Sequence, residues 1–127
     1  MNINKKTNNP LNSNANALKI LKTVPFGEGF HFFTDSMEYA GTTATSLFEF
    51  EEKLKILSVK SVEYHFRRHD FQRWISDSLG DVKLAAQIAL LDTQLTSENL
   101  RNALVRILRN RILELEKCEH DFLAKTN

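Results

Sequence analysis

Four residues within one short stretch carry the side chains best suited to chemistry in this sequence: His65, Arg68, Asp70 and Trp74. An imidazole, a guanidinium and an indole N–H all donate hydrogen bonds, and Arg is a strong partner for anionic groups. The four residues therefore predict a site for a small anionic ligand or a partner peptide. The same stretch equally fits a structural role, in which Asp70 caps a helix, Arg68 pairs across a turn and His65 bonds to a backbone carbonyl. Both interpretations stay open at this stage.

Other kinds of catalytic or metal chemistry find no support in the sequence. His65 and His69 are four residues apart, but the other histidines, His31 and His120, are distant in sequence and no H-E-x-x-H motif occurs. Cys118 is the single cysteine, so an intramolecular disulfide is excluded, and it falls on the apolar side of a predicted helix. The G-E-G at 27–29 lacks the further glycine and lysine of a phosphate loop. We therefore expect a non-enzymatic protein with no catalytic residue, no metal and no cofactor.

The charge of the chain is nearly balanced overall but unevenly distributed. Seventeen Lys and Arg face sixteen Asp and Glu, which gives a formal net charge of +1. Four of these bases and none of the acids lie in residues 1–25, so residues 26–127 carry a net charge of −3. Since a net acidic domain repels phosphate, nucleic acid is an unlikely partner, and weak binding through the C-terminal arginines is the least favoured hypothesis. These arginines are Arg101, Arg106, Arg109 and Arg111.

Helical patterning begins at Ser46 and continues to the end of the chain. Ser46 and Glu49 form a capping box, and Asp70 and Asp81 are further candidates for helix caps. Gly80 suits a left-handed helix end. Apolar residues recur at helical spacing between these signals, which predicts a core of short helices over residues 46–95.

One long helix is predicted over residues 97–118, beginning at Ser97. Its apolar stripe is broad, and Arg111 projects near the middle of it. A guanidinium against hydrocarbon is costly without a partner, so Arg111 either pairs with a carboxylate or marks contact with water or another chain. A helix of this length can extend past the core of a small domain and pair with a second copy. The predicted interface comprises Leu104, Ile107, Leu108, Arg111 and Leu115.

The first third of the chain has a different character. Residues 1–16 contain seven Asn and few apolar residues, which predicts a disordered leader. Residues 17–45 form an irregular entry segment in which Phe30 and Phe32 alternate with His31 and Phe33, as in an aromatic-rich loop or a short hairpin. No signal peptide and no membrane span is recognisable, so we expect a cytoplasmic protein that does not enter a membrane.

Residues 30–85 resemble a known but uncharacterised prokaryotic family, domain of unknown function 5752. The resemblance rests on A-T-S-L-F-E-F at 44–50, S-V-E-Y-H-F-R-R-H-D-F-Q-R-W-I at 61–75 and L-G-D-V-K-L-A at 79–85. F-H-F-F-T at 30–34 and the turn at 39–41 are similar to the entry segment of that family. The resemblance implies a compact helical domain and assigns neither a reaction nor catalytic residues.

Together these observations predict a mainly α fold. We expect a single domain over residues 17–127, built as a compact bundle of four to five helices after an aromatic-rich loop or short hairpin. The leading functional hypothesis is a non-enzymatic protein-interaction or regulatory domain, with a protein partner or a homodimer formed through the C-terminal helix. The alternative is a small anionic-ligand sensor that uses His65, Arg68, Asp70 and Trp74.

Overall fold

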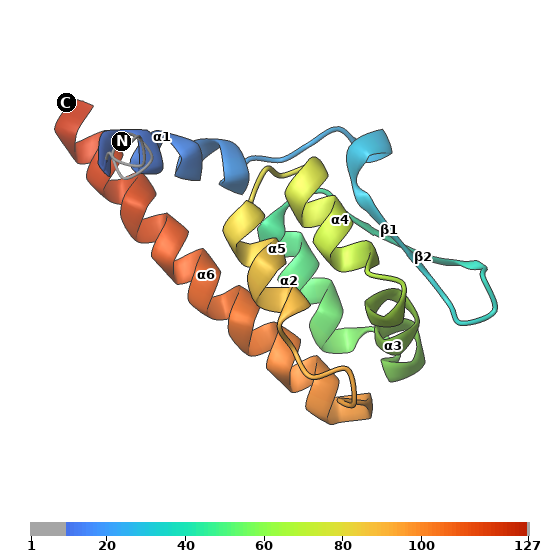
Figure 1. The fold of residues 1–127 in the computed structure, drawn as a ribbon. Helices are drawn as coiled ribbons and strands as arrows, with labels where there is room; N and C mark the ends of the chain where they lie inside the picture. Colours follow the sequence, from blue (N-terminus) through green and yellow to red (C-terminus); the bar gives the residue numbers. More distant parts are fainter. Residues whose placement is uncertain (1–9, 127) are drawn as a thin grey trace, which may run out of the picture.

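A computed structural model describes residues 10–126 and confirms the mainly α fold with a short hairpin (Figure 1). None of its helices is both long enough and apolar enough to span a membrane, within the described residues. The elements follow in the order α1 (Pro10–Leu21), a 3₁₀ turn (Phe26–Glu28), β1 (Phe30–Phe33), β2 (Tyr39–Ala44), α2 (Leu47–Ile56), α3 (Val59–Arg67), α4 (Asp70–Asp77), α5 (Val82–Ala89) and α6 (Ser97–Thr126).

Helices α1 and α6 differ from the predicted boundaries. The leader was expected to cover residues 1–16; residues 1–9 lie outside the described part, and α1 already begins at Pro10. Proline suits the first position of a helix because its missing N–H has no partner there. Helix α6 continues to Thr126 instead of ending at 118, and α1 packs along it. The far part of α6 is therefore covered by α1 and does not extend past the core unpartnered.

Local capping signals place most of the short helices. Ser46 Oγ accepts a hydrogen bond from Glu49 N at 3.1 Å, and the Glu49 carboxylate accepts one from Thr45 N at 2.8 Å. Asp81 Oδ1 accepts from Leu84 N at 3.1 Å, as predicted for the cap of α5. Gly80 before it has a φ of 78°, the left-handed conformation expected of a helix end.

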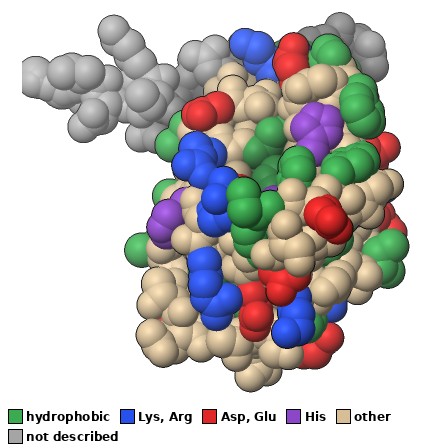
Figure 2. Space-filling view, turned by 90° about the vertical axis from the view of Figure 1, so that its right-hand side faces the viewer, with side chains coloured by type: hydrophobic (Ala, Val, Ile, Leu, Met, Phe, Trp, Pro, Cys, Tyr) green, Lys and Arg blue, Asp and Glu red, His purple; other side chains and the backbone are tan. Residues whose placement is uncertain are grey.

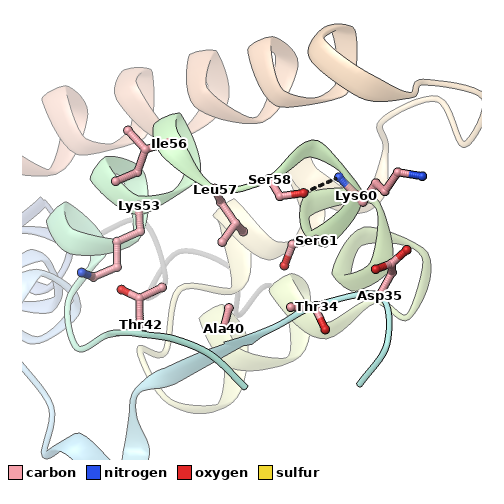
Figure 3. Close-up of a pocket in the computed structure, with 10 residues that line it drawn as sticks. All are labelled: Thr34, Asp35, Ala40, Thr42, Lys53, Ile56, Leu57, Ser58, Lys60 and Ser61. Atoms are coloured by element: carbon pink, nitrogen blue, oxygen red, sulfur yellow. Dashed lines mark hydrogen bonds between the residues drawn. The ribbon is translucent and has the colours of Figure 1, made fainter. Parts of the chain in front are cut away.

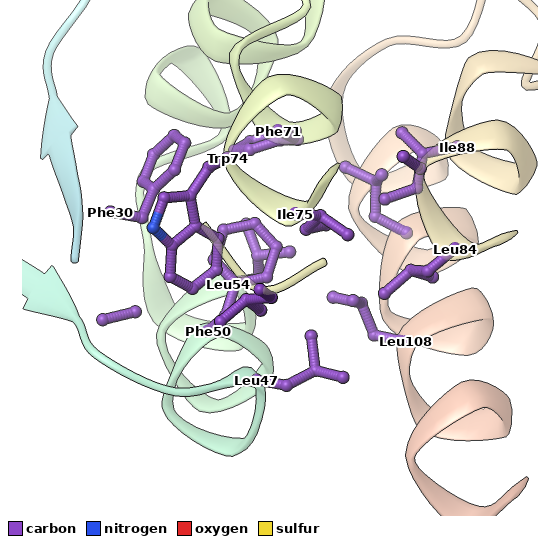
Figure 4. Packing of buried hydrophobic residues seen from close by; sticks show 14 of the residues in the cluster. Phe30, Leu47, Phe50, Leu54, Phe71, Trp74, Ile75, Leu84, Ile88 and Leu108 are labelled. Atoms are coloured by element: carbon purple, nitrogen blue, oxygen red, sulfur yellow. The ribbon is translucent and has the colours of Figure 1, made fainter. Parts of the chain in front are cut away.

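The hydrophobic core joins the short helices to α6 and to the inner face of the hairpin (Figure 4). Phe50 lies at its aromatic centre, with ring centroids 5.3 Å from both Phe71 and Trp74 and 5.4 Å from Phe30. Aliphatic side chains fill the space between this aromatic cluster and α6. They include Leu54, Ile75, Leu84, Ile88 and Leu108, all fully buried.

The hairpin pairs β1 with β2 in antiparallel register, with Phe30 opposite Ala44, His31 opposite Thr43 and Phe33 opposite Tyr39. Phe30 and Phe32 are buried, whereas His31 and Phe33 alternate with them and are only partly covered. Helices α2–α5 lie between the hairpin and α6 in Figure 1. The hairpin thus has one face in the core and one face toward solvent.

Candidate functional site

The structure brings three of the four predicted site residues together at the junction of α3 and α4. His65 Nδ1 lies 2.9 Å from Asp70 Oδ2, and Arg68 Nε donates to the same oxygen at 3.0 Å. His65 is buried and Asp70 is mostly buried, while Arg68 is exposed. We call these residues, together with Arg73, the α3–α4 polar cluster. The structure places Arg73 here because its Nη2 donates to Asp70 Oδ1 at 2.7 Å.

Both ring nitrogens of His65 are occupied within the chain. The backbone N–H of Phe33 in β1 donates to Nε2 at 2.9 Å, so Nε2 carries no proton. The proton therefore sits on Nδ1 and is donated to Asp70. Burial is the main cause that lowers the pKa of His65, against the opposing effect of the Asp70 carboxylate. A neutral, doubly hydrogen-bonded imidazole thus links the hairpin to the helices.

Asp70 is the ionic centre of this cluster rather than a helix cap. The prediction that its side chain caps α4 is wrong, because the capping position is His69, with a left-handed φ of 63° and no side-chain cap bond. Burial raises the pKa of Asp70, but the hydrogen bonds from His65, Arg68 and Arg73 outweigh this effect, so the pKa lies below its usual value. The carboxylate prefers these charged partners to the weaker amide donors of its own helix.

Trp74 does not join the α3–α4 polar cluster. Its indole N–H donates to the backbone oxygen of Glu28 at 2.8 Å, and its ring packs into the core between Phe30 and Phe50. The four residues therefore do not converge on a common ligand position. Each polar atom of His65 and Asp70 already has a partner, so the arrangement acts as an internal link and leaves no open position at these atoms for a ligand.

Two further contributors to this link carry no recognisable signal in the sequence. One is the backbone of Phe33, whose N–H reaches His65 and whose oxygen accepts a short hydrogen bond from Ser61 Oγ. The other is Arg73, which also donates to the backbone oxygen of Arg68 at 2.8 Å. The Phe33 contacts depend on how β1 lies across α3, which is a long-range property of the fold, whereas those of Arg73 are local to α4 and the turn before it.

The predicted interface on α6 is largely used inside the same chain. Leu104 and Leu108 are fully buried, and Leu115 is 3% exposed, against other elements of this domain. Ile107 is half-buried and packs against the same core. The middle of this stripe is therefore covered within the chain itself, and these three leucines are not part of its surface. The apolar stripe is wide because several helices cover it.

Arg111, the charged residue within that stripe, has carboxylate partners in the same chain. Its Nε and Nη2 donate to the two carboxylate oxygens of Asp81 at 2.8 and 3.0 Å, and Nη1 donates to Glu114 at 2.5 Å. Burial alone would lower the pKa of Arg111, but these hydrogen bonds outweigh it and raise the pKa. Arg111 is therefore the partner of a carboxylate within the chain, one of the two outcomes the sequence predicted.

The other arginines of α6 are mostly paired as well. Arg109 donates to both carboxylate oxygens of Glu51, a buried acid of α2. Arg101 donates to Glu98 at 2.8 Å and to the backbone oxygen of Leu54 at 2.6 Å. Since these guanidinium groups are held by carboxylates or by backbone, they do not form a free basic stripe along the helix.

An aromatic cluster covers the solvent face of the hairpin, on the side that Figure 2 presents. The ring centroids of Phe26 and His31 are 5.2 Å apart, those of His31 and Tyr39 6.3 Å, and those of Phe33 and Tyr39 6.1 Å. Phe26 is 64% exposed and Tyr39 49%. Thr43 anchors the cluster, because its Oγ1 lies 2.8 Å from both His31 Nδ1 and Tyr39 Oη. We call these four aromatic residues the hairpin face.

Residues 10–126 therefore define a small, mainly helical domain with an aromatic hairpin docked against its helices. No group of three or more His, Cys, Asp or Glu side chains within that range is arranged to hold a metal ion. The chain belongs to a family of unknown function, domain of unknown function 5752, whose model matches residues 2–109 and, in a second match, residues 67–124. No curated protein and no solved structure matches the chain.

Proposed function

We propose that this chain is a non-enzymatic protein-interaction domain whose contact surface is the hairpin face rather than α6. The observation that carries the proposal is the exposure of contacting aromatic rings on and beside the hairpin, with Phe26 64% and Tyr39 49% exposed. Exposed aromatic clusters on monomeric proteins commonly mark binding surfaces, and Tyr and Phe are enriched at protein interfaces. The rings are held in place, so little conformational entropy is lost when a partner covers them.

The charge around the hairpin face indicates the chemistry of the partner. Glu28 and Glu38 are exposed on the 3₁₀ turn and the hairpin, and neither forms an ion pair among the described residues. The sequence contains no Lys or Arg from residue 23 to residue 52. An aromatic surface with an acidic border fits an apolar protein segment flanked by Lys or Arg, whose cations can also lie over the ring faces.

The acidic residues around the hairpin face also disfavour two other partners. A second copy of this chain would bring Glu28 and Glu38 of one chain against the same acids of the other, so self-association through the hairpin is disfavoured. Nucleic acid would meet the same acids, and most α6 arginines are engaged in ion pairs. We place the domain in the cytoplasm, as the sequence predicts, where the free thiol of Cys118 is compatible with a reducing environment.

Site-specific photo-cross-linking in the native host tests this proposal. Benzoylphenylalanine replaces Tyr39 in one variant and Leu90 in a control, because Leu90 is 85% exposed but lies beyond α5 and away from the hairpin. We expect one discrete adduct from position 39 and none from position 90. The cross-linked segment should be rich in Lys or Arg, and adding Phe26→Ala should reduce the yield. Equal adducts at both positions, an acidic cross-linked segment or a species of twice the chain's mass would overturn the proposal.

A further inference from the structure

A cavity of about 420 Å³ lies between β2 and the corner where α2 meets α3 (Figure 3). Its size is within the range of small-molecule sites. It is separate from the α3–α4 polar cluster, because none of the residues of that cluster lines it. The residues that line it are Thr34, Asp35, Ala40, Thr42, Lys53, Ile56, Leu57, Ser58, Lys60 and Ser61.

One end of the cavity presents a lysine that forms no ion pair, beside a hydroxyl that forms no hydrogen bond among the described residues. Figure 3 shows Lys53 and Thr42 together at this end, from α2 and β2 respectively. Lys53 has no ion-pair partner and Thr42 Oγ1 has no hydrogen-bond partner among the described residues. Glu51 and Glu52 pair with Lys55. Glu49, four residues before Lys53, attracts it only through charge and without an ion pair, because its carboxylate accepts hydrogen bonds from Thr45.

The middle of the cavity is apolar, and the serine hydroxyls at its other end already have hydrogen-bond partners. The apolar wall is formed by Ala40, Ile56 and Leu57, of which Ile56 is 85% exposed to solvent. At the far end, Ser61 Oγ donates to the Phe33 backbone and Ser58 Oγ accepts from Lys60 N at 3.2 Å. Asp35 and Lys60 stand together at that end with opposite charges, so it offers no net charge to a ligand.

From this arrangement we propose that the cavity binds a small organic carboxylate with an apolar body. The carboxylate accepts hydrogen bonds from Lys53 Nζ and Thr42 Oγ1, and the apolar body covers Ala40, Ile56 and Leu57. One ammonium and one hydroxyl match a singly charged carboxylate, whereas a phosphate monoester with its greater charge and three acceptor oxygens calls for more donors. This site shares no side chain with the hairpin face, because none of the four aromatic residues of that face lines the cavity.

Titration of the full chain with hexanoate, followed by amide chemical shifts, tests the assignment. We expect saturable shifts at residues 40, 42 and 57, no such shifts with hexan-1-ol, and weaker binding of hexyl phosphate than of hexanoate. Lys53→Gln should weaken hexanoate binding about tenfold or more, and Thr42→Val about threefold or more. Lys22→Gln is the matched control, since Lys22 is an exposed lysine outside the cavity, and it should bind as the wild type does.

Four results would overturn the assignment. Absence of saturable shifts up to about 10 mM hexanoate would show that no such site exists. Equal binding of hexan-1-ol would remove the role of the anion, and tighter binding of hexyl phosphate would replace carboxylate by phosphate. Equal weakening by Lys53→Gln and Lys22→Gln would show a general charge effect. Lys53 is a partly exposed surface residue, so the variant should fold, and an unchanged unfolding midpoint checks this.

Discussion

The ion pair between Asp81 and Arg111 should make one of the largest single polar contributions to the stability of this domain. The Asp81 side chain is 1% exposed and the Arg111 side chain 12%, and the two residues join the start of α5 to α6. Removing one partner of a buried ion pair costs about 3–5 kcal/mol. Arg111 keeps Glu114 and some contact with water, so we expect the lower end, about 3 kcal/mol, for Asp81→Asn.

Comparison of two substitutions separates the ion pair from the helix cap. Asn can still cap α5 by accepting the Leu84 N–H, whereas Ala cannot, so Asp81→Ala should cost about 1 kcal/mol more than Asp81→Asn. Adding Arg111→Met to Asp81→Asn should restore much of the lost stability, because an apolar side chain replaces an unpaired charge. The coupling free energy from this double-mutant cycle should exceed about 1 kcal/mol.

Urea unfolding followed by circular dichroism and by the fluorescence of Trp74, the single tryptophan, measures these free energies. A loss below about 0.5 kcal/mol for Asp81→Asn, or a coupling free energy near zero, would refute the assignment of the pair. The unfolding midpoint should not depend on protein concentration, because both partners belong to one chain. A midpoint that rises with concentration would show that a second copy contributes to stability.

Three further outcomes follow from other parts of the fold. The pKa values of His65 and Asp70 are both lowered, so the folded state favours the deprotonated form of each residue. The urea midpoint of unfolding should therefore fall as the pH drops below about 6.5, and fall again through the acidic range. A midpoint that rises between pH 7 and pH 5 would contradict this. Gly29→Ala should lower the thermal midpoint, because a Cβ there would lie 2.7 Å from the Ala44 backbone oxygen; an unchanged midpoint would count against this packing of the hairpin. Leu104→Glu should unfold the domain rather than dissociate a dimer, because the Leu104 side chain is fully buried. Circular dichroism and light scattering together distinguish these two outcomes.

Features set by neighbouring residues were predictable from the sequence. The caps at Ser46 and Asp81 and the left-handed Gly80 act within four residues of their partners, and the structure confirms all three. The alternation of Phe30 and His31 likewise indicated one buried and one open face of the hairpin. Such signals report on local backbone conformation, which a single sequence contains directly.

Features set by long-range contacts were not predictable in the same way. Asp70 looks like a cap, but it pairs with His65, which is in turn held by the backbone N–H of Phe33, 32 positions earlier in the chain. Trp74 looks like a site residue, but its N–H finds a carbonyl 46 positions earlier in the chain. The apolar stripe of α6 looked available to a second copy, because nothing local shows that α1 and the short helices cover it. For the same reason, the cavity beside Lys53 has no signature in the sequence.

Affinity for the segment captured at position 39 tests the role of the hairpin face most directly. Calorimetric titration of that segment, as a synthetic peptide, compares the wild type with Phe26→Ala, Tyr39→Ala and the control Leu90→Ala. Each hairpin substitution should weaken binding about tenfold or more, as expected of aromatic residues at the centre of an interface, and binding should weaken with added salt. Leu90→Ala should bind as the wild type does. Equal affinity of all four proteins would contradict the account, since the hairpin face would then contribute nothing to partner binding.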